Sequence, residues 1–442
     1  MEQSASAARR SGRAARLKVP LAVVAVATAA LGIAACSGSG SHGGGNSITV
    51  AVSASPSATA LEALAPAFEK KTGIKLSFVN LPYAQLAAKV LLSSREPGHG
   101  YDVIQFDSPM LASLANGGAL ADIGPQARRS ASYDYADIPT QVQQYAQYHG
   151  TTYALPLSTE PYILWYNTRL FSKLGLKPPT TWPQYVNDAK KLSAAGFYGN
   201  DSGFGSQIGA YYWLETIYLY GGSLFSGSTC TPALSSPAAQ AATRTYLSLL
   251  GSTPATAVNG GGNEMTTAFT QGNVGQMINA TGYYSIMADP SQSKIPGKFA
   301  GALPPTAGPQ GHTLLFGWLI GIGKNSSAPS SAWKFLQFAL AKSNTSTFIA
   351  KGAPPAARTS LLDDQAATKQ LPYLPALIGS AKIGVHLPYI TQMPQIITSL
   401  SQLLSQAATR HPAASQLGQA ANALTSAADS SLKSIMSGVD SC

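Results

Sequence analysis

The sequence predicts an α/β fold, because strand patterns and helix patterns alternate along the first part of the chain. Residues 48–52 are apolar and rich in β-branched side chains, and residues 74–79 alternate as a strand does. Between them, apolar residues recur at helical spacing from Leu61 to Phe68. A third strand is predicted over 102–106. Strands connected by helices in this way form a parallel sheet.

The middle and end of the chain predict further elements. Residues 162–167 have the content of a strand. Residues 181–184 match a capping box, in which the Thr181 hydroxyl and the Gln184 amide serve free N–H groups at a helix start. A late strand is predicted over 314–320. Apolar residues at helical spacing after Met393 predict C-terminal helices that pack on the body.

The first residues have the pattern of a secretory signal. Five Lys and Arg residues precede an apolar stretch over 19–35, and small residues stand directly before Cys36. A cysteine at this place resembles the lipobox of bacterial lipoproteins, whose thiol receives diacylglycerol and becomes the mature N-terminus. A transmembrane anchor is the weaker alternative, because the stretch is slightly short and contains Pro20. We therefore expect a signal peptide over 1–35, and a lipidated cysteine with a flexible Gly/Ser tether over 36–47.

Composition narrows the class of protein. Without the leader 407 residues remain, which favours two domains. The leader carries a charge of +4, so the net charge falls from +10 to +6. No Lys/Arg cluster follows it, and the sequence has no zinc, helix-turn-helix or RNA-binding motif, so nucleic acid is not an expected partner.

Two cysteines, Cys230 and Cys442, remain after lipidation at Cys36. In an oxidising compartment such a pair is a candidate disulfide, and two unpaired thiols are the alternative.

A series of short motifs points to a family. Its centre runs from Tyr153-Ala154-Leu155-Pro156 through Trp165-Tyr166-Asn167 to residues 178–182. Further motifs occupy residues 68–74, 101–103, 117–120, 221–225, 269–277, 332–336 and 354–358. In order and spacing, the set resembles the extracellular solute-binding proteins of the sugar-binding group, the receptors of ABC importers, similar to maltodextrin-binding protein.

This resemblance implies a two-lobe periplasmic-binding-protein-like fold (type II), with discontinuous α/β lobes joined by hinge segments. Lobe 1 would comprise residues 48–158 and 318–355, and lobe 2 residues 159–317 and 356–442. The crossings would lie near 158–159, 316–317 and 353–357. A solute in the cleft would stabilise the closed state, which the permease distinguishes from the open one.

Sugars present hydroxyl edges and apolar faces, so their sites combine polar side chains with aromatic rings. By the resemblance, Glu160 stands where the family places a ligand-contacting acid; a solvated loop carboxylate is the alternative. Core packing is an almost equal alternative for Trp213. The full set of expected ligand contacts is Glu160, Tyr283, Tyr284, Tyr211, Trp213, Trp318, Asp107 and Arg358.

An enzyme is not expected. The chain has no His-Glu-x-x-His pair and no Gly-x-Ser-x-Gly elbow, and residues 321–326 only partly match a phosphate loop. A glycosidase would need two cleft carboxylates, but the binding-protein motifs explain far more residues. No cofactor and no metal are expected.

The expected protein is a monomeric receptor, lipid-anchored to the outer face of the cytoplasmic membrane. It would deliver a mono-, di- or short oligosaccharide to an ABC permease. The alternatives are a polyol, a glycerol-phosphate compound or a polyamine as the solute, or a cell-surface interaction lipoprotein without transport.

Overall fold

A five-stranded sheet organises the first half of the chain in the computed structural model, which describes residues 47–95, 100–227 and 230–439. Its strands, in spatial order, are β2 (Lys75–Asn80), β1 (Ser47–Val52), β3 (Val103–Asp107), β13 (Trp318–Ile322) and β6 (Ala154–Pro156). The first three strands are parallel, as the sequence predicts. Strand β13 enters from far along the chain and runs antiparallel to β3 and β6.

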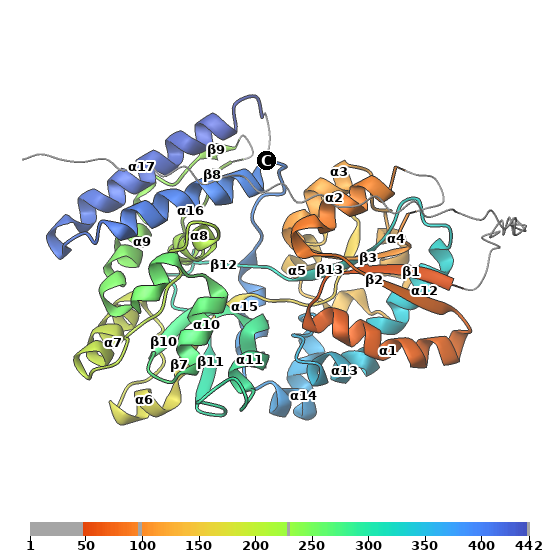
Figure 1. The fold of residues 1–442 in the computed structure, drawn as a ribbon, viewed down its shortest axis with the longest axis horizontal. Coiled ribbons are helices and arrows are strands. Elements are labelled where there is room, and N and C mark those ends of the chain that lie inside the picture. Colours follow the sequence, from red (N-terminus) through yellow and green to blue (C-terminus); the bar gives the residue numbers. More distant parts are fainter. Residues whose placement is uncertain (1–46, 96–99, 228–229, 440–442) are drawn as a thin grey trace, which may run out of the picture. The chain divides into compact units, whose positions relative to one another are not determined.

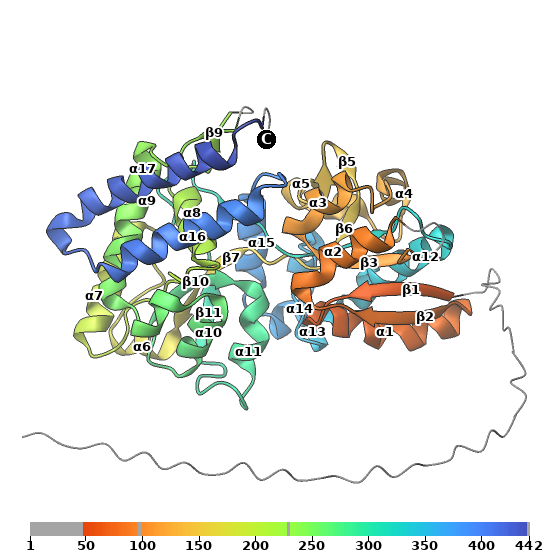
Figure 2. The ribbon, with the colours of Figure 1, turned by 45° about the horizontal axis from the view of Figure 1, so that its top comes forward.

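Helices cover both faces of this sheet. In Figures 1 and 2, α1 (Pro56–Thr72) lies along one face and α2 (Tyr83–Ser93) along the other. Ser55 caps α1 by accepting a hydrogen bond from the Ala58 N–H, and Gly73 ends the helix in the left-handed conformation. Inside, Phe68 packs edge-on against Phe335. The other helices of this region are α3 (Leu111–Asn116), α4 (Gly124–Arg129), α5 (Thr140–Gln144), α12 (Pro329–Ala339) and α13 (Thr345–Ala350).

A three-stranded antiparallel sheet forms the second centre. Its central strand β7 (Tyr162–Asn167) lies between β10 (Gln276–Ala280) and β11 (Phe299–Ala302). Fully buried Trp165 anchors it, and its indole N–H donates to the Asn279 carbonyl. The helices of this region are α6 (Thr168–Lys173), α7 (Trp182–Ala194), α8 (Gly209–Leu219), α9 (Pro237–Ser248), α10 (Gly262–Thr270), α11 (Tyr284–Ala288), α15 (Leu374–Lys382), α16 (Met393–Thr409) and α17 (Leu417–Ile435).

Several sequence expectations for this region are confirmed. The capping box at Thr181 and Gln184 starts α7. Helix α16 packs on α8 and α17, and α17 packs on α9, so the C-terminal helices do cover the body. The remaining α-helix is α14 (Gln365–Gln370). The remaining strands form three short pairs: β4 (Gln147–Tyr148) with β5 (Thr151–Thr152), β8 (Phe225–Ser226) with β9 (Thr231–Pro232), and β12 (Thr313–Leu314) with β14 (Gly384–Val385).

The prediction of one strand over 314–320 is wrong. The segment forms two strands, β12 and β13, which residues 315–317 separate. Gly317 has φ 152°, a backbone conformation that L side chains rarely adopt, and a Cβ there would lie 2.3 Å from the Ser158 carbonyl oxygen. The chain therefore cannot run straight through this point as one ladder.

Three segments connect the two sheet regions and hydrogen-bond to one another. They lie where the sequence places the crossings: residues 157–161 between β6 and β7, residues 315–317, and residues 353–357. The bonds join Ser158 N–H to Trp318 O (3.1 Å), Glu160 N–H to Phe316 O (2.8 Å), Thr159 N–H to Pro355 O (3.2 Å) and Ala357 N–H to Thr159 Oγ1 (2.9 Å).

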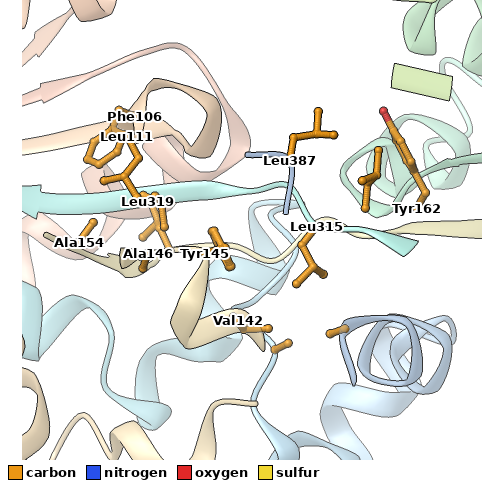
Figure 3. Close-up of a cluster of buried hydrophobic side chains, with 14 of the residues drawn as sticks. Phe106, Leu111, Val142, Tyr145, Ala146, Ala154, Tyr162, Leu315, Leu319 and Leu387 are labelled. Atoms are coloured by element: carbon orange, nitrogen blue, oxygen red, sulfur yellow. The ribbon is translucent and has the colours of Figure 1, made fainter. Parts of the chain in front are cut away.

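Buried apolar side chains flank these segments. Figure 3 shows Leu319 and Ala154 of the five-stranded sheet, Leu315 of the second crossing and Tyr162 of β7. Between them stands fully buried Tyr145, whose hydroxyl donates to the Ser158 carbonyl at 2.6 Å.

Some expectations fall on residues that the structure does not describe. The leader, Cys36 and the tether up to residue 46 lie there, and so does Cys442. The predicted end of the tether is one residue too late, because Ser47 already pairs in β1. Cys230 is disulfide-bonded, but its pairing with Cys442 stays a prediction. Among the described residues, no helix has the length and apolarity to cross a membrane. Within the same ranges, no three His, Cys, Asp or Glu side chains gather in a way that could hold a metal ion.

Candidate ligand-binding cleft

A cleft of ≈ 580 Å³ opens where the crossing segments meet the two sheets. Its volume lies within the range of small-molecule sites, roughly 300–1,000 Å³. It is lined by residues of β3, β13 and the start of α1, by the crossings, and by residues of β7, α8 and α10. Side chains from both sheet regions therefore face one space.

Asp107 provides the carboxylate on the side of the five-stranded sheet. It ends β3 beside Trp318, which begins β13. The Tyr83 hydroxyl donates to Asp107 Oδ2 at 2.8 Å, and the Tyr83 ring meets Trp318 edge-on at 6.1 Å. Burial raises the pKa of Asp107 to about 6, although the bonds from Tyr83 and from the Ser108 N–H favour its ionised form.

Glu160 provides the second carboxylate, from the first crossing. Its N–H donates to Phe316 O, and its Oε1 accepts from the Ser158 hydroxyl at 2.7 Å. Gly282 lies against it so closely that a Cβ there would be 2.3 Å from Oε2. Burial raises the pKa of Glu160 to about 7; the Ser158 hydrogen bond opposes this and the charge of Asp107 adds to it.

Aromatic rings line the other side. Tyr162 stacks on Tyr212 with ring centroids 5.4 Å apart. Phe316 of the second crossing packs against Tyr162 and meets Tyr211 edge-on at 5.2 Å. Tyr283 completes this wall, and burial, with smaller contributions from nearby carboxylates, raises the pKa of its hydroxyl to about 12. These hydroxyls stay neutral near pH 7 and can donate and accept hydrogen bonds.

Polar groups at two helix starts complete the lining. Ser55 and Ser57 come from the start of α1, and Asn263 comes from the first turn of α10. Among the described lining residues there is no Lys, Arg or His. The cleft can thus offer two carboxylates, several hydroxyls, an amide and aromatic faces, but no positive side chain.

A family model gives the identification. The model described as bacterial extracellular solute-binding protein matches residues 53–346. The chain belongs to this family. Family members bind solutes and are not enzymes, in agreement with the sequence expectation.

Curated relatives agree with this membership. Three putative binding proteins of Brucella are 30% identical over 203 residues, 44% of this chain and 47% of each relative, so the chain spans about half the length of these relatives. The mannitol-binding protein of Pseudomonas aeruginosa is 24% identical over 393 residues, 83% of this chain and 89% of that protein.

Solved structures show the same fold. A solute-binding protein of Agrobacterium vitis S4 with bound D-mannitol has a TM-score of 0.69 and 25% identity, covering 86% of this chain and 97% of that one. Maltose-bound MalE3 of T. maritima has a TM-score of 0.71 at 21% identity, covering 86% and 99%. The two-lobe type II fold expected from the sequence is therefore confirmed.

The structure brings five of the expected contact residues into the cleft of this solute-binding protein. They are Asp107, Glu160, Tyr211, Tyr283 and Trp318. The residues come from segments more than 200 positions apart, and the crossings bring them together. No ligand is present, so their role as contacts is a proposal.

The other three expected contacts lie elsewhere, and we leave them out of the site. Trp213 is fully buried, and its indole N–H donates to Thr243 Oγ1 at 2.8 Å, so the core alternative describes its placement. Tyr284 packs against Tyr373 and Trp165 beside β7. Arg358 is 3% exposed, and its guanidinium points to Leu340 and Asp137 and not into the cleft.

Sequence reasoning missed Tyr83, Tyr162, Tyr212 and Asn263, which line the cleft. The sequence does contain one sign that Trp213 lies outside the cleft. Successive residues of helix α8 point about 100° apart, so Tyr211, Tyr212 and Trp213 cannot all face the same side. Nothing in the sequence around Tyr83 indicates that its hydroxyl reaches Asp107, 24 positions away.

Proposed function

We propose that this protein is the substrate-binding component of an ABC importer and that its cleft binds a sugar or a polyol. The observation that carries the proposal is the lining: two carboxylates stand among neutral hydroxyls and aromatic rings. Carboxylates accept hydrogen bonds from solute hydroxyls, and aromatic faces pack against apolar C–H surfaces. The names of the mannitol-binding relative and of the D-mannitol-bound neighbour support this class.

The lining also argues against one of the alternative solutes. A glycerol-phosphate compound carries negative charge, and the described lining holds Asp107 and Glu160 without a basic side chain. Burying a phosphate beside carboxylates without a cation is unfavourable. A polyamine stays as the second candidate, because the same two carboxylates could accept bonds from ammonium groups.

The further parts of the proposal concern the whole chain. The protein would be exported, tethered by a lipid on Cys36 to the outer face of the cytoplasmic membrane, and would deliver its solute to the permease as a monomer. Residues 48–158 and 318–355 would form lobe 1. Residues 159–317 and 356–442 would form lobe 2, although Ser360, near the start of its last segment, bonds to Asp137 in the lobe 1 range.

A thermal-shift screen tests the proposed solute class. Residues 44–442 form one compact unit, so the chain can be produced without its leader. It is screened against sugars, polyols, glycerol phosphates and polyamines. A ligand at 100 times its dissociation constant adds about 2.7 kcal/mol of stability, and we expect this from one class of sugars or polyols alone.

Two variants show whether such a ligand binds in the cleft. Glu160→Gln removes a lining carboxylate and should abolish most of the shift. Glu62→Gln changes an exposed acid on α1 and should leave the shift unchanged. Stabilisation by glycerol phosphates or polyamines alone would contradict the proposed class. A sugar shift that survives Glu160→Gln would contradict the proposed site.

A further inference from the structure

Glu215 is a buried acid that the cleft itself does not use. It lies on α8 and is 1% exposed. No ion pair among the described residues includes it. A buried carboxylate without a cation is strongly unfavourable unless it is neutral or well hydrogen-bonded. Its surroundings therefore determine its protonation state.

Glu215 contacts β12 directly and β7 through Thr313, and both strands adjoin crossing segments that line the cleft. Its Oε2 accepts from the Leu314 N–H at 2.7 Å, and its Oε1 lies 2.8 Å from Thr313 Oγ1. Thr313 Oγ1 also lies 3.2 Å from the carbonyl oxygen of Tyr162. Tyr162 follows the first crossing, and β12 precedes the second, so one carboxyl group joins both.

The number of hydrogens available around Thr313 favours the neutral form of Glu215. The Thr313 hydroxyl has a single hydrogen but two oxygen neighbours. If Glu215 is ionised, that one hydrogen is either directed at a single oxygen or shared between both, so at least one of the two contacts is weakened. If Glu215 carries a proton, it can donate to Thr313 Oγ1, and Thr313 can donate to Tyr162 O. Oε2 accepts from Leu314 in either case, so the neutral form gives each contact a hydrogen of its own.

The electrostatic surroundings agree with this count. Burial raises the pKa of Glu215 to about 8, while the bonds from Leu314 and Thr313 oppose the rise only in part. The titratable groups that surround it are the tyrosines Tyr162 of β7, Tyr212 of α8, Tyr185 of α7 and Tyr246 of α9; the carboxyl group of Asp201, whose pKa burial raises to about 7, acts on Tyr185 and Tyr246 from behind. Burial raises the pKa of each.

Two other elements approach this position without offering a cation to it. Next to Thr313, the His312 ring nitrogen Nδ1 contacts the Ile383 carbonyl at 3.1 Å. Helix α16 bonds to α8 through the Ser401 hydroxyl, which accepts from the Ala210 N–H. No described positive group is in contact with Glu215 to stabilise its ionised form.

We propose that Glu215 is a positioning residue of the cleft, which in its neutral form holds together the segments that carry Tyr162 and Phe316. Both rings line the cleft and pack against each other. Ionisation of Glu215 would leave the single Thr313 hydrogen for two acceptors, weaken the link between the segments and loosen this wall. The hinge-side wall of the cleft is therefore sensitive to alkaline pH, whatever solute it binds.

Glu215→Gln tests the proposal, because glutamine reproduces the neutral acid. Its amide N–H can donate to Thr313 Oγ1, and its amide oxygen can accept from Leu314. The folded-state pKa of Glu215 is raised above its unfolded value of 4.5, so the stability linked to this group is complete below that value and is lost as pH rises through about 8. Glutamine has no such loss.

The measurement is the melting temperature from pH 5 to pH 9.5, for the wild type and for the variant. We expect the two proteins to have similar melting temperatures at pH 5. As the pH rises, the melting temperature of the wild type should fall increasingly below that of Glu215→Gln. Glu62→Gln, at an exposed position, should follow the wild type. Infrared difference spectra between pH 6 and pH 9.5 should show, beside the band of Glu160, a protonated-carboxyl band that disappears at high pH; this second band is missing in Glu215→Gln and kept in Glu160→Gln.

Two results would overturn the proposal. One is a Glu215→Gln curve that runs parallel to the wild type over the whole pH range. The other is a carboxyl spectrum that loses no band in Glu215→Gln compared with the wild type. Thr313→Val provides a second test, since it removes the hydroxyl that links the two segments. It should destabilise both the wild type and Glu215→Gln at pH 5, where the neutral bond is fully formed.

Discussion

At the scale of single residues, the cleft depends on a small residue as much as on its charged ones. Gly282 precedes Tyr283, and its missing side chain leaves room for the Glu160 carboxyl group. A Cβ at this position would lie 2.3 Å from Glu160 Oε2, closer than real Cβ contacts, and 3.0 Å from Cδ. A larger residue at position 282 would therefore push the Glu160 carboxyl group out of its present place.

Gly282→Ala should therefore displace Glu160 and weaken solute binding by about tenfold or more, in line with ~1–3 kcal/mol for losing a buried hydrogen-bond partner. Binding is measured by calorimetry with the solute that the screen identifies. Gly418→Ala is the matched control: no atom lies within 4 Å of its Cβ position, and alanine favours helix α17. Equal affinity in both variants would show that Glu160 does not depend on Gly282.

The sequence could indicate some of these residues but not others. Glu160 and Tyr283 follow motifs whose spacing is visible in the chain, and both line the cleft. Trp213 and Arg358 also belong to recognisable segments, but their direction depends on packing. The indole of Trp213 turns to Thr243, and the guanidinium of Arg358 turns to Asp137. Side-chain direction across distant segments is a tertiary property that local patterns do not contain.

At the scale of elements, local signals predicted the fold well wherever a cap or a run of β-branched and aromatic residues marks the element in the sequence. The capping box of α7 and the strand β7 are examples. The late strand was predicted as one element, but it is interrupted over residues 315–317, where Gly317 lies close to the Ser158 carbonyl, more than 150 positions earlier. The crossings were placed by resemblance, and no periodicity marks them.

The third crossing continues into a charged anchor. The Arg358 guanidinium donates to the carbonyls of Asp134 and Leu340 and lies 3.5 Å from Asp137 Oδ2. Asp137 also accepts from the N–H and the hydroxyl of Ser360. Burial disfavours the ionised form of Asp137, but Ser360 and Lys342 outweigh it, so its pKa lies below the usual value.

Asp137→Ala should lower the free energy of unfolding by ~1–3 kcal/mol, because it leaves Arg358 buried without its carboxylate. Since the pKa of Asp137 is lowered, its contribution is present above the unfolded value of 3.8 and is lost as pH falls through the folded value. Urea unfolding at pH 7 and pH 3 measures both effects. The difference between wild type and variant should shrink at pH 3; a difference independent of pH would contradict a charged anchor.

At the scale of the whole molecule, the two sheet regions share one cleft because three crossings hold them at fixed points. A hinge of this kind allows closure around a solute, and the solute shifts the equilibrium only by the difference in its affinity for the two states. Asp107 and Glu160 lie on different segments, so a solute that bonds both would favour the closed state.

The last prediction concerns where this molecule works. A lipid on Cys36 would keep the binding unit within reach of a permease, whereas a protein released from the membrane would diffuse away. Cys36→Ser removes the acceptor thiol and should move the protein from the membrane fraction to the medium or the soluble fraction, detected by immunoblot after fractionation. Ser39→Ala is the matched control, because it changes a residue close to Cys36 without removing the acceptor thiol and should leave membrane association intact. Retention of Cys36→Ser at the membrane would mean that another segment anchors the chain, and the lipoprotein proposal would fall while the cleft and its solute class would stand.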